Sequence, residues 1–183
     1  FKRAIHAIDS TTIALVANCM DWAKHRRRKA AAKMHLRLNL QSFLPGFAVI
    51  EEASHHDDTQ TLALCAGLQA GEIVVSDKAY VHFANLFHLT GRGIFWVTRA
   101  KDNLRYHVCR KRLGKPQGGI LRDDEITLKV PASRRQYPQR LRRIEAEVEV
   151  NGEWVVMVFL TNNMDWAPSS VCELYRSRWG IEV

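Results

Sequence analysis

The sequence predicts an α/β fold in which helices pack on a mixed β-sheet. Two alternating segments, 33–40 and 47–52, are typical of half-buried strands that pair as a hairpin. Two short apolar runs, 72–76 and 94–98, are typical of buried strands, and each follows a segment with helical spacing. A hairpin followed by helix-connected strands predicts antiparallel strands beside parallel ones, an order that several α/β folds share.

The N-terminal segments place a first acidic candidate at the end of a strand. Residues 3–9 alternate toward apolar side chains and predict a strand that ends at Asp9. Residues 11–16 are rich in β-forming side chains and predict a short extension or a turn. The basic, alanine-rich segment 18–32 predicts a loop or a partly helical excursion. Leu44-Pro45-Gly46 then predicts the turn of the hairpin.

The middle of the chain places a second acidic candidate at the end of another strand. Asp57-Asp58-Thr59 precedes apolar residues with helical spacing, which predicts a helix with a polar cap that ends at Gly71. We therefore expect the run H-H-D-D to be a loop with an aspartate as the helix cap, rather than a metal cluster. The buried-type strand 72–76 ends at Asp77, and a second helix is predicted over 80–89.

The stretch 101–164 predicts a β-rich insertion before the last helix. Alternating segments predict strands over 126–130, 141–150 and 154–160. Asn151-Gly152, between the last two, is a strong hairpin signal. We expect Trp154 to pack in the core of this hairpin. A final helix is predicted to begin at Pro168-Ser169-Ser170.

Composition favours a nucleic-acid partner and excludes several other classes of protein. The net charge is +8 and the pI is about 9.6, and basic residues cluster at 24–29 and 134–143. Such clusters can neutralise backbone phosphates. No apolar run of 18 or more residues predicts a membrane span. The four cysteines form no C-x-x-C pair, which fits a reducing cytosol. No phosphate-binding glycine loop or G-x-S-x-G supports ATP or serine chemistry.

A pattern in the last helix points to metal-assisted chemistry on phosphate. In E-L-Y-R-S-R-W-G-I-E-V, the residues Tyr175, Arg178 and Glu182 are spaced so that a helix places all three on one face. Two aspartates at strand ends plus this glutamate suit a site for two magnesium ions about 4 Å apart, which serve in-line displacement at phosphorus.

These blocks resemble the DDE transposases of bacterial insertion sequences, in particular the "IS four" group. Their third block is written Y-(2)-R-(3)-E-(6)-K. I-D-S-T resembles their first block, S-D-K-A-Y their second, and F-W-V-T-R-A-K-D-N a later strand. The resemblance covers nearly the whole chain and implies a ribonuclease-H-like (retroviral-integrase-like) fold. Because the lysine of the pattern would fall beyond Val183, we expect a catalytic core cut within its last helix.

The resemblance also implies roles for individual residues. It assigns metal binding and catalysis to Asp9, Asp77 and Glu182. It implies two magnesium ions, with manganese tolerated. It gives Tyr175, Arg178, Lys33 and His35 as candidate DNA contacts. Lys78 and Arg99 are further candidates because they flank strand ends at the expected active edge, and Arg26, Arg27 and Arg28 because they belong to a basic cluster. For Lys33 and His35, which resemble a K-x-H feature of these enzymes, we favour a structural role over DNA contact.

The sequence thus predicts a transposase that cleaves DNA at transposon ends and transfers the strand into target DNA. The expected divisions are a core over 1–100, the insertion over 101–164 and the final helix over 165–183. Expected partners are the terminal inverted repeats, target DNA and, for the full-length protein, a second copy, all in the bacterial cytoplasm at the nucleoid. Two alternatives stay open: a structure-specific nuclease of the same fold, and a non-catalytic DNA-binding remnant.

Overall fold

The computed structural model describes residues 3–14, 24–25, 29–52, 54 and 56–179. The strands in these residues are β1 Ile5–Ala14, β2 Lys24–His25, β3 Lys29–Asn39, β4 Pro45–Glu52, β5 Ile73–Ser76, β6 Phe95–Arg99, β7 Tyr106–Lys111, β8 Ile120–Leu128, β9 Leu141–Val150 and β10 Glu153–Thr161. The helices are α1 Thr61–Leu64, α2 Phe83–Gly91, α3 Pro131–Gln136 and α4 Pro168–Trp179, with 3-10 turns η1 Asp57–Gln60 and η2 Lys78–Tyr80.

The described strands form one mixed sheet, as the sequence predicts. Their order is β2-β3-β1-β5-β6-β10-β9-β8-β7, and β4 also pairs with β3. The pairs β1–β3 and β3–β4 are antiparallel, whereas β1–β5 and β5–β6 are parallel. The predicted hairpin and the two helix-connected strands are therefore confirmed.

The first strand runs further than the sequence predicts. Its parallel pairing with β5 stops at Ile8 opposite Ser76, but its antiparallel pairing with β3 continues to Ala14 opposite Ala31. The expected strand end at Asp9 is thus wrong, since this residue lies within β1 at the point where one of two partners leaves. The same pairing places residues 29–32 in β3 rather than in a loop or helix.

The segment 57–71 is less helical than predicted. The α-helix is confined to α1, and the residue at the cap of the preceding turn is His56, whose side chain makes no capping hydrogen bond. The predicted capping role of the aspartates is wrong. The carboxylate of Asp57 is directed instead to Ser10 and Lys33, which neutralise and bind it more completely than backbone N–H groups at a short turn.

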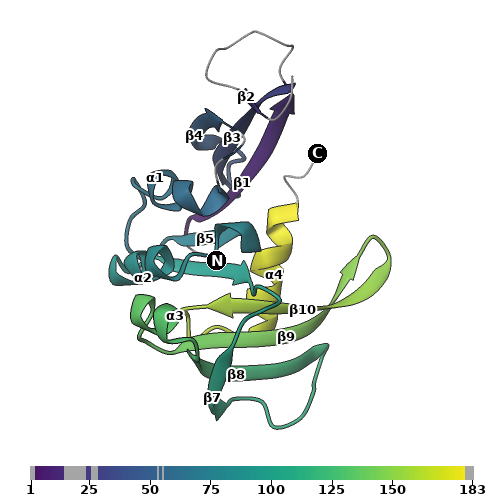
Figure 1. Cartoon of the computed structure of the whole chain (residues 1–183). Coiled ribbons are helices and arrows are strands. Elements are labelled where there is room, and N and C mark those ends of the chain that lie inside the picture. Colours follow the sequence, from purple (N-terminus) through teal and green to yellow (C-terminus); the bar gives the residue numbers. More distant parts are fainter. Residues whose placement is uncertain (1–2, 15–23, 26–28, 53, 55, 180–183) are drawn as a thin grey trace.

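The strands of 101–164 extend the sheet of the first hundred residues, because β10 pairs antiparallel with β6. Figure 1 shows β7 to β10 continuing the sheet below β5. Strand β8 begins six residues before the predicted segment, at Ile120. The apolar alternation did not predict the first half of this strand, because that half contains three buried acidic residues, Asp123, Asp124 and Glu125. Arginines from neighbouring strands and loops make this burial possible: Arg142 donates to Asp123 at 2.8 and 2.7 Å.

The predicted turn between β9 and β10 is confirmed. Both Asn151 and Gly152 have positive φ, at 53° and 83°, as a tight hairpin turn between right-twisted strands requires. The expectation for Trp154 is wrong, because its side chain is 69% exposed. The hairpin projects beyond the last covering helix, so its outer residues have no apolar layer to pack against (Figure 1).

Helices cover the sheet on both faces. Because side chains alternate along a strand, Val74 belongs to the apolar layer beneath α1 and α2, whereas Ile73 and Val75 belong to the layer beneath α4. Helix α4 begins at Pro168, as predicted, and buries Val171, Leu174, Tyr175 and Arg178. No helix in the described part of the chain is long and apolar enough to cross a membrane.

The hairpin turn supplies a test of the fold. Substituting Gly152→Ala should lower the free energy of unfolding by about 1 kcal/mol, because a Cβ disfavours positive φ. A Cβ at Gly152 or at Gly91 would meet nothing within 4 Å. Gly91→Ala, at the helical end of α2, is therefore the matched control and should be neutral or stabilising by up to about 1 kcal/mol. Equal effects in urea denaturation would contradict the turn geometry.

Candidate active site

Two aspartates meet where β1 and β5 separate. The last parallel pair is Ile8 opposite Ser76, and the next residues along the two strands are Asp9 and Asp77. Parallel strands direct equivalent residues to the same edge, so both carboxylates emerge side by side. Strand β1 continues past this point against β3 alone, which leaves the space beyond β5 open to the site.

Helix α4 brings a cation to both aspartates. Arg178 donates from Nη1 to Asp9 Oδ2 at 2.5 Å, and its Nη2 lies 4.0 Å from Asp77 Oδ2. The hydroxyl of Tyr175, one turn earlier, donates to Asp77 Oδ2 at 3.3 Å. The side chain of Arg178 is only 6% exposed, whereas those of Asp9 and Asp77 are 35% and 30% exposed. The structure thus brings together four of the residues that the sequence singles out.

Backbone donors fix the orientation of the two carboxylates. The N–H of Ser10 donates to Asp9 Oδ1 at 2.9 Å. The N–H of Ala79, in the turn η2, donates to Asp77 Oδ1 at 3.1 Å. On each aspartate, Oδ1 is held by the main chain while Oδ2 faces α4. Charged acceptors bound in this way lose rotamer freedom, which is what a preorganised site requires.

Tyr175 is held in place by packing as well as by its hydroxyl. Its ring lies 5.0 Å from that of Phe159 and 5.8 Å from that of Trp179, between ring centroids, and the residue is fully buried. Burial raises the pKa of Tyr175 to about 12, and the charges of Arg178 and Arg99 only partly oppose this rise. The phenol is therefore a neutral hydrogen-bond donor at physiological pH.

Two of the candidate DNA contacts are directed into the protein. His35 is fully buried, and its ring nitrogens lie 2.9 Å from the hydroxyl of Tyr80 and 3.0 Å from Glu51 Oε1. Lys33 is 16% exposed and donates to Asp57 Oδ1 at 2.8 Å. The structural role that we favour for this pair agrees with these contacts.

Of two further candidate DNA contacts, Lys78 lies on the open side of the site and Arg99 ends the neighbouring strand β6. A cavity of about 500 Å³ next to Asp77 is lined by Lys78, Lys101 and Asp102, among others. Lys78 Nζ lies 2.9 Å from Asp102 Oδ2, in an exposed pair that contributes little to stability. Arg99 is half-buried, and its Nε has no hydrogen-bond partner among the described residues.

Other predicted site residues lie outside the described residues. They are Glu182, Arg26, Arg27 and Arg28. Within the described residues, no three His, Cys, Asp or Glu side chains are grouped so as to hold a metal ion.

Sequence reasoning missed three members of the site's surroundings: Glu51, Asp57 and Tyr80. Tyr80 had a signal, because it closes the S-D-K-A-Y block only three residues after Asp77. The sequence predicted Asp57 only as a helix cap, because nothing in it shows that η1 packs against β1. Glu51 had no signal beyond its place in the β4 alternation.

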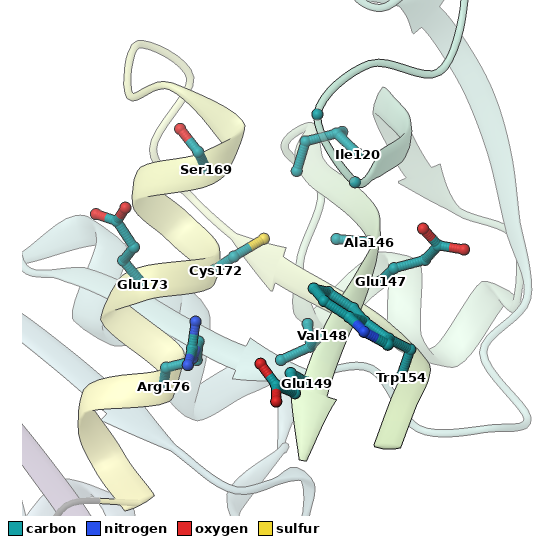
Figure 2. Close-up of a pocket in the computed structure, with 12 residues that line it drawn as sticks. Ile120, Ala146, Glu147, Val148, Glu149, Trp154, Ser169, Cys172, Glu173 and Arg176 are labelled. Carbon is teal, nitrogen blue, oxygen red and sulfur yellow. The ribbon is translucent and has the colours of Figure 1, made fainter. Parts of the chain in front are cut away.

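A separate cavity of about 550 Å³ lies between α4 and the β9–β10 hairpin. Figure 2 shows the ring of Trp154 at one wall and Cys172 and Arg176 of α4 at the other. Glu147 and Glu149 stand beside the tryptophan. Neither Asp9 nor Asp77 is among the described residues that line this cavity, so it is distinct from the site at the two aspartates.

The family comparison covers the whole chain. Residues 1–183 match the family model described as the transposase DDE domain. The chain is 24% identical over its full length to a protein named as a transposase for insertion sequence element IS5377 of Geobacillus stearothermophilus, of which it covers 47%. It is 28% identical over its full length to a protein named as transposase y4zB of Sinorhizobium fredii, of which it covers 50%. The chain thus spans about half the length of these curated relatives.

A solved structure shares the fold. The chain resembles piggyBac transposase, determined as a synaptic complex with hairpin DNA, with a TM-score of 0.58 and 8% sequence identity. The likeness covers 98% of this chain and 39% of that one. At this identity the likeness concerns the fold alone, and it confirms the ribonuclease-H-like class predicted from the sequence.

The ion pair at the site can be tested through stability. Replacing Arg178→Met should lower the free energy of unfolding by about 1–3 kcal/mol, because it leaves Asp9 without its buried cation. The exposed Arg176→Met on the same helix is the matched control and should stay within about 0.5 kcal/mol. Thermal and urea unfolding of both variants measure the difference. A loss no larger for Arg178 than for Arg176 would contradict the contact.

Proposed function

Because the chain belongs to the transposase DDE domain family, we propose that it is the catalytic core of an insertion-sequence transposase. The observation that supports this most directly is the meeting of Asp9, Asp77 and Arg178, of which the first and last are 169 positions apart. The proposed enzyme hydrolyses a phosphodiester at each transposon end. It then uses the freed 3′-hydroxyl to attack target DNA. Both steps are displacements at phosphorus, so one site can perform both.

The described carboxylates suit divalent metal ions. Magnesium prefers oxygen ligands, and Asp9 and Asp77 direct their Oδ2 atoms toward the same guanidinium, so this space already holds positive charge. Asp9, Asp77 and Glu182 would hold these ions, with Asp9 shared between the two and manganese as a substitute. Two such ions supply activation of the attacking oxygen and stabilisation of the leaving one.

Arg178 and Tyr175 are the proposed contacts to the scissile phosphate. A guanidinium binds phosphate in a bidentate manner, and a neutral phenol donates a further hydrogen bond. In the structure, however, both side chains are engaged by Asp9 and Asp77. Phosphate binding therefore requires Arg178 to exchange one anionic partner for another, and its five donors allow it to bind either.

The open side of the site is the proposed entry for DNA. Lys78 and Lys101 line the cavity beside Asp77, and Arg99 ends the neighbouring strand β6. We propose that these residues, with the basic run 26–28, contact backbone phosphates of transposon ends and target DNA. Such contacts make affinity fall steeply with salt. For the full-length protein we propose a homodimer that pairs two ends.

The metal ligands can be tested by cleavage of short branched DNA with manganese. Loss of a residue that only supports a metal ligand typically costs about 10–100-fold in activity. Asp9→Ala and Asp77→Ala should each reduce nicking by more than this, because they remove a ligand itself. Glu149→Gln, on the exposed hairpin, is the control and should cleave like the wild type. Wild-type nicking by either aspartate variant would remove the basis for the proposed site.

Strand transfer separates the proposed function from its alternatives. A transposase should join a donor end with a free 3′-hydroxyl to a target duplex, which gives a longer labelled strand on a denaturing gel. Blocking the donor with a 3′-deoxy end should abolish this product while leaving nicking intact, because the nucleophile is then missing. Nicking without joining would indicate a nuclease, and neither activity would indicate a DNA-binding remnant.

A further inference from the structure

A layer of hydrogen-bonded side chains lies behind the two aspartates. It joins β3, β4 and the turns η1 and η2 to β1, and the proposed chemistry does not use it. Its members are Ser10, Lys33, His35, Glu51, Asp57 and Tyr80.

Two of the contacts in this layer converge on Asp57. Its Oδ1 accepts from Lys33 Nζ at 2.8 Å, and its Oδ2 accepts from the hydroxyl of Ser10 at 3.2 Å. Ser10 in turn donates its backbone N–H to Asp9 Oδ1 at 2.9 Å. A continuous path of contacts therefore runs from Lys33 through Asp57 and Ser10 to Asp9.

Tyr80 meets the second aspartate through the main chain, because its N–H donates to the carbonyl oxygen of Asp77 at 3.1 Å. It is 1% exposed, and its hydroxyl lies 2.9 Å from His35 Nδ1, whose other nitrogen lies 3.0 Å from Glu51. Burial raises the pKa of Tyr80, and the charges of Asp57, Asp9 and Asp77 raise it further.

The desolvation cost of burying the charges of Lys33 and Asp57 indicates that this pair has a role other than stabilising the fold. Each side chain is only 16% exposed, and taking two charges out of water largely offsets their attraction. Such a pair does, however, hold its neighbours in one geometry. Ser10 follows Asp9 directly, at the point where β1 has lost its partner β5, so the main chain there has pairing on one side only.

We propose that Asp57 is a positioning residue for Asp9, acting through Ser10 and held in place by Lys33. This inference rests on the proposed function, because it names what orients the carboxylate that would hold both metal ions. It also assigns Lys33 to the protein interior rather than to DNA. Residues that orient metal ligands typically change metal affinity or activity by about 10–100-fold.

Calorimetric titration of the purified protein with manganese tests the proposal. Asp57→Asn keeps the size of the side chain but removes its charge, and should weaken manganese binding by about 10–100-fold. Glu145→Gln is the matched control, because Glu145 is 22% exposed and lies 2.7 Å from Arg143, away from the aspartates. It should bind manganese like the wild type. Asp9→Ala should abolish binding.

DNA binding distinguishes positioning from direct contact. Asp57→Asn and Lys33→Gln should lower the rate of cleavage at saturating DNA while leaving DNA affinity and its salt dependence unchanged. If Lys33→Gln instead weakened DNA binding and made its salt dependence shallower, Lys33 would contact phosphate and the proposal would be overturned.

The outcomes separate this inference from the function on which it rests. Wild-type binding by Asp57→Asn, with binding lost in Asp9→Ala, would overturn the positioning role alone. Wild-type binding by Asp9→Ala would overturn the proposed metal site and the inference with it. Should Asp57→Asn fail to fold, as judged by circular dichroism, Ser10→Ala takes its place. It removes only the hydroxyl that connects Asp57 to β1, and wild-type binding by it would equally overturn the role.

Discussion

The site depends on one ion pair between the ends of the described chain. Arg178 on α4 reaches Asp9 on β1, although 169 positions separate them. For this contact to form, α4 must pack against one face of the sheet, and β10 must pair with β6 so that the chain returns to the core. The buried residues Val171 and Leu174 supply the apolar attachment, while Arg178, on the same face of the helix, carries the charge.

The positions of Asp9 and Asp77 could be predicted because the apolar runs that precede them are local features, although Asp9 lies within β1 rather than at its end. Short β-rich runs identify the strands, and the parallel arrangement then brings their ends together. The surroundings of Asp57 could not be predicted in this way, since its partners come from β1 and β3 and depend on tertiary packing. Only the second half of β8 could be predicted, for the same reason. Its first half buries acidic residues that are paired with arginines from other parts of the chain.

Charge is distributed unevenly between the inside and the open side of the site. Inward, Arg178 and Lys33 already face carboxylates, so their charges organise the protein. Outward, Lys78 and Lys101 line the cavity beside Asp77, and Lys78 pairs there with the exposed Asp102. From the sequence, Arg178, Lys78 and Arg99 were alike candidates for DNA contact, because residue type and spacing do not reveal which way a side chain points.

The central claim is that Asp9 and Asp77 together bind the metal ion of a phosphoryl-transfer site. Anomalous diffraction from crystals grown with manganese tests it most directly, because the peak locates the ion without reference to activity. We expect a peak in contact with carboxylate oxygens of both aspartates, with Arg178 turned away from Asp9. A peak only at other residues, with the Arg178–Asp9 pair intact, would contradict the account.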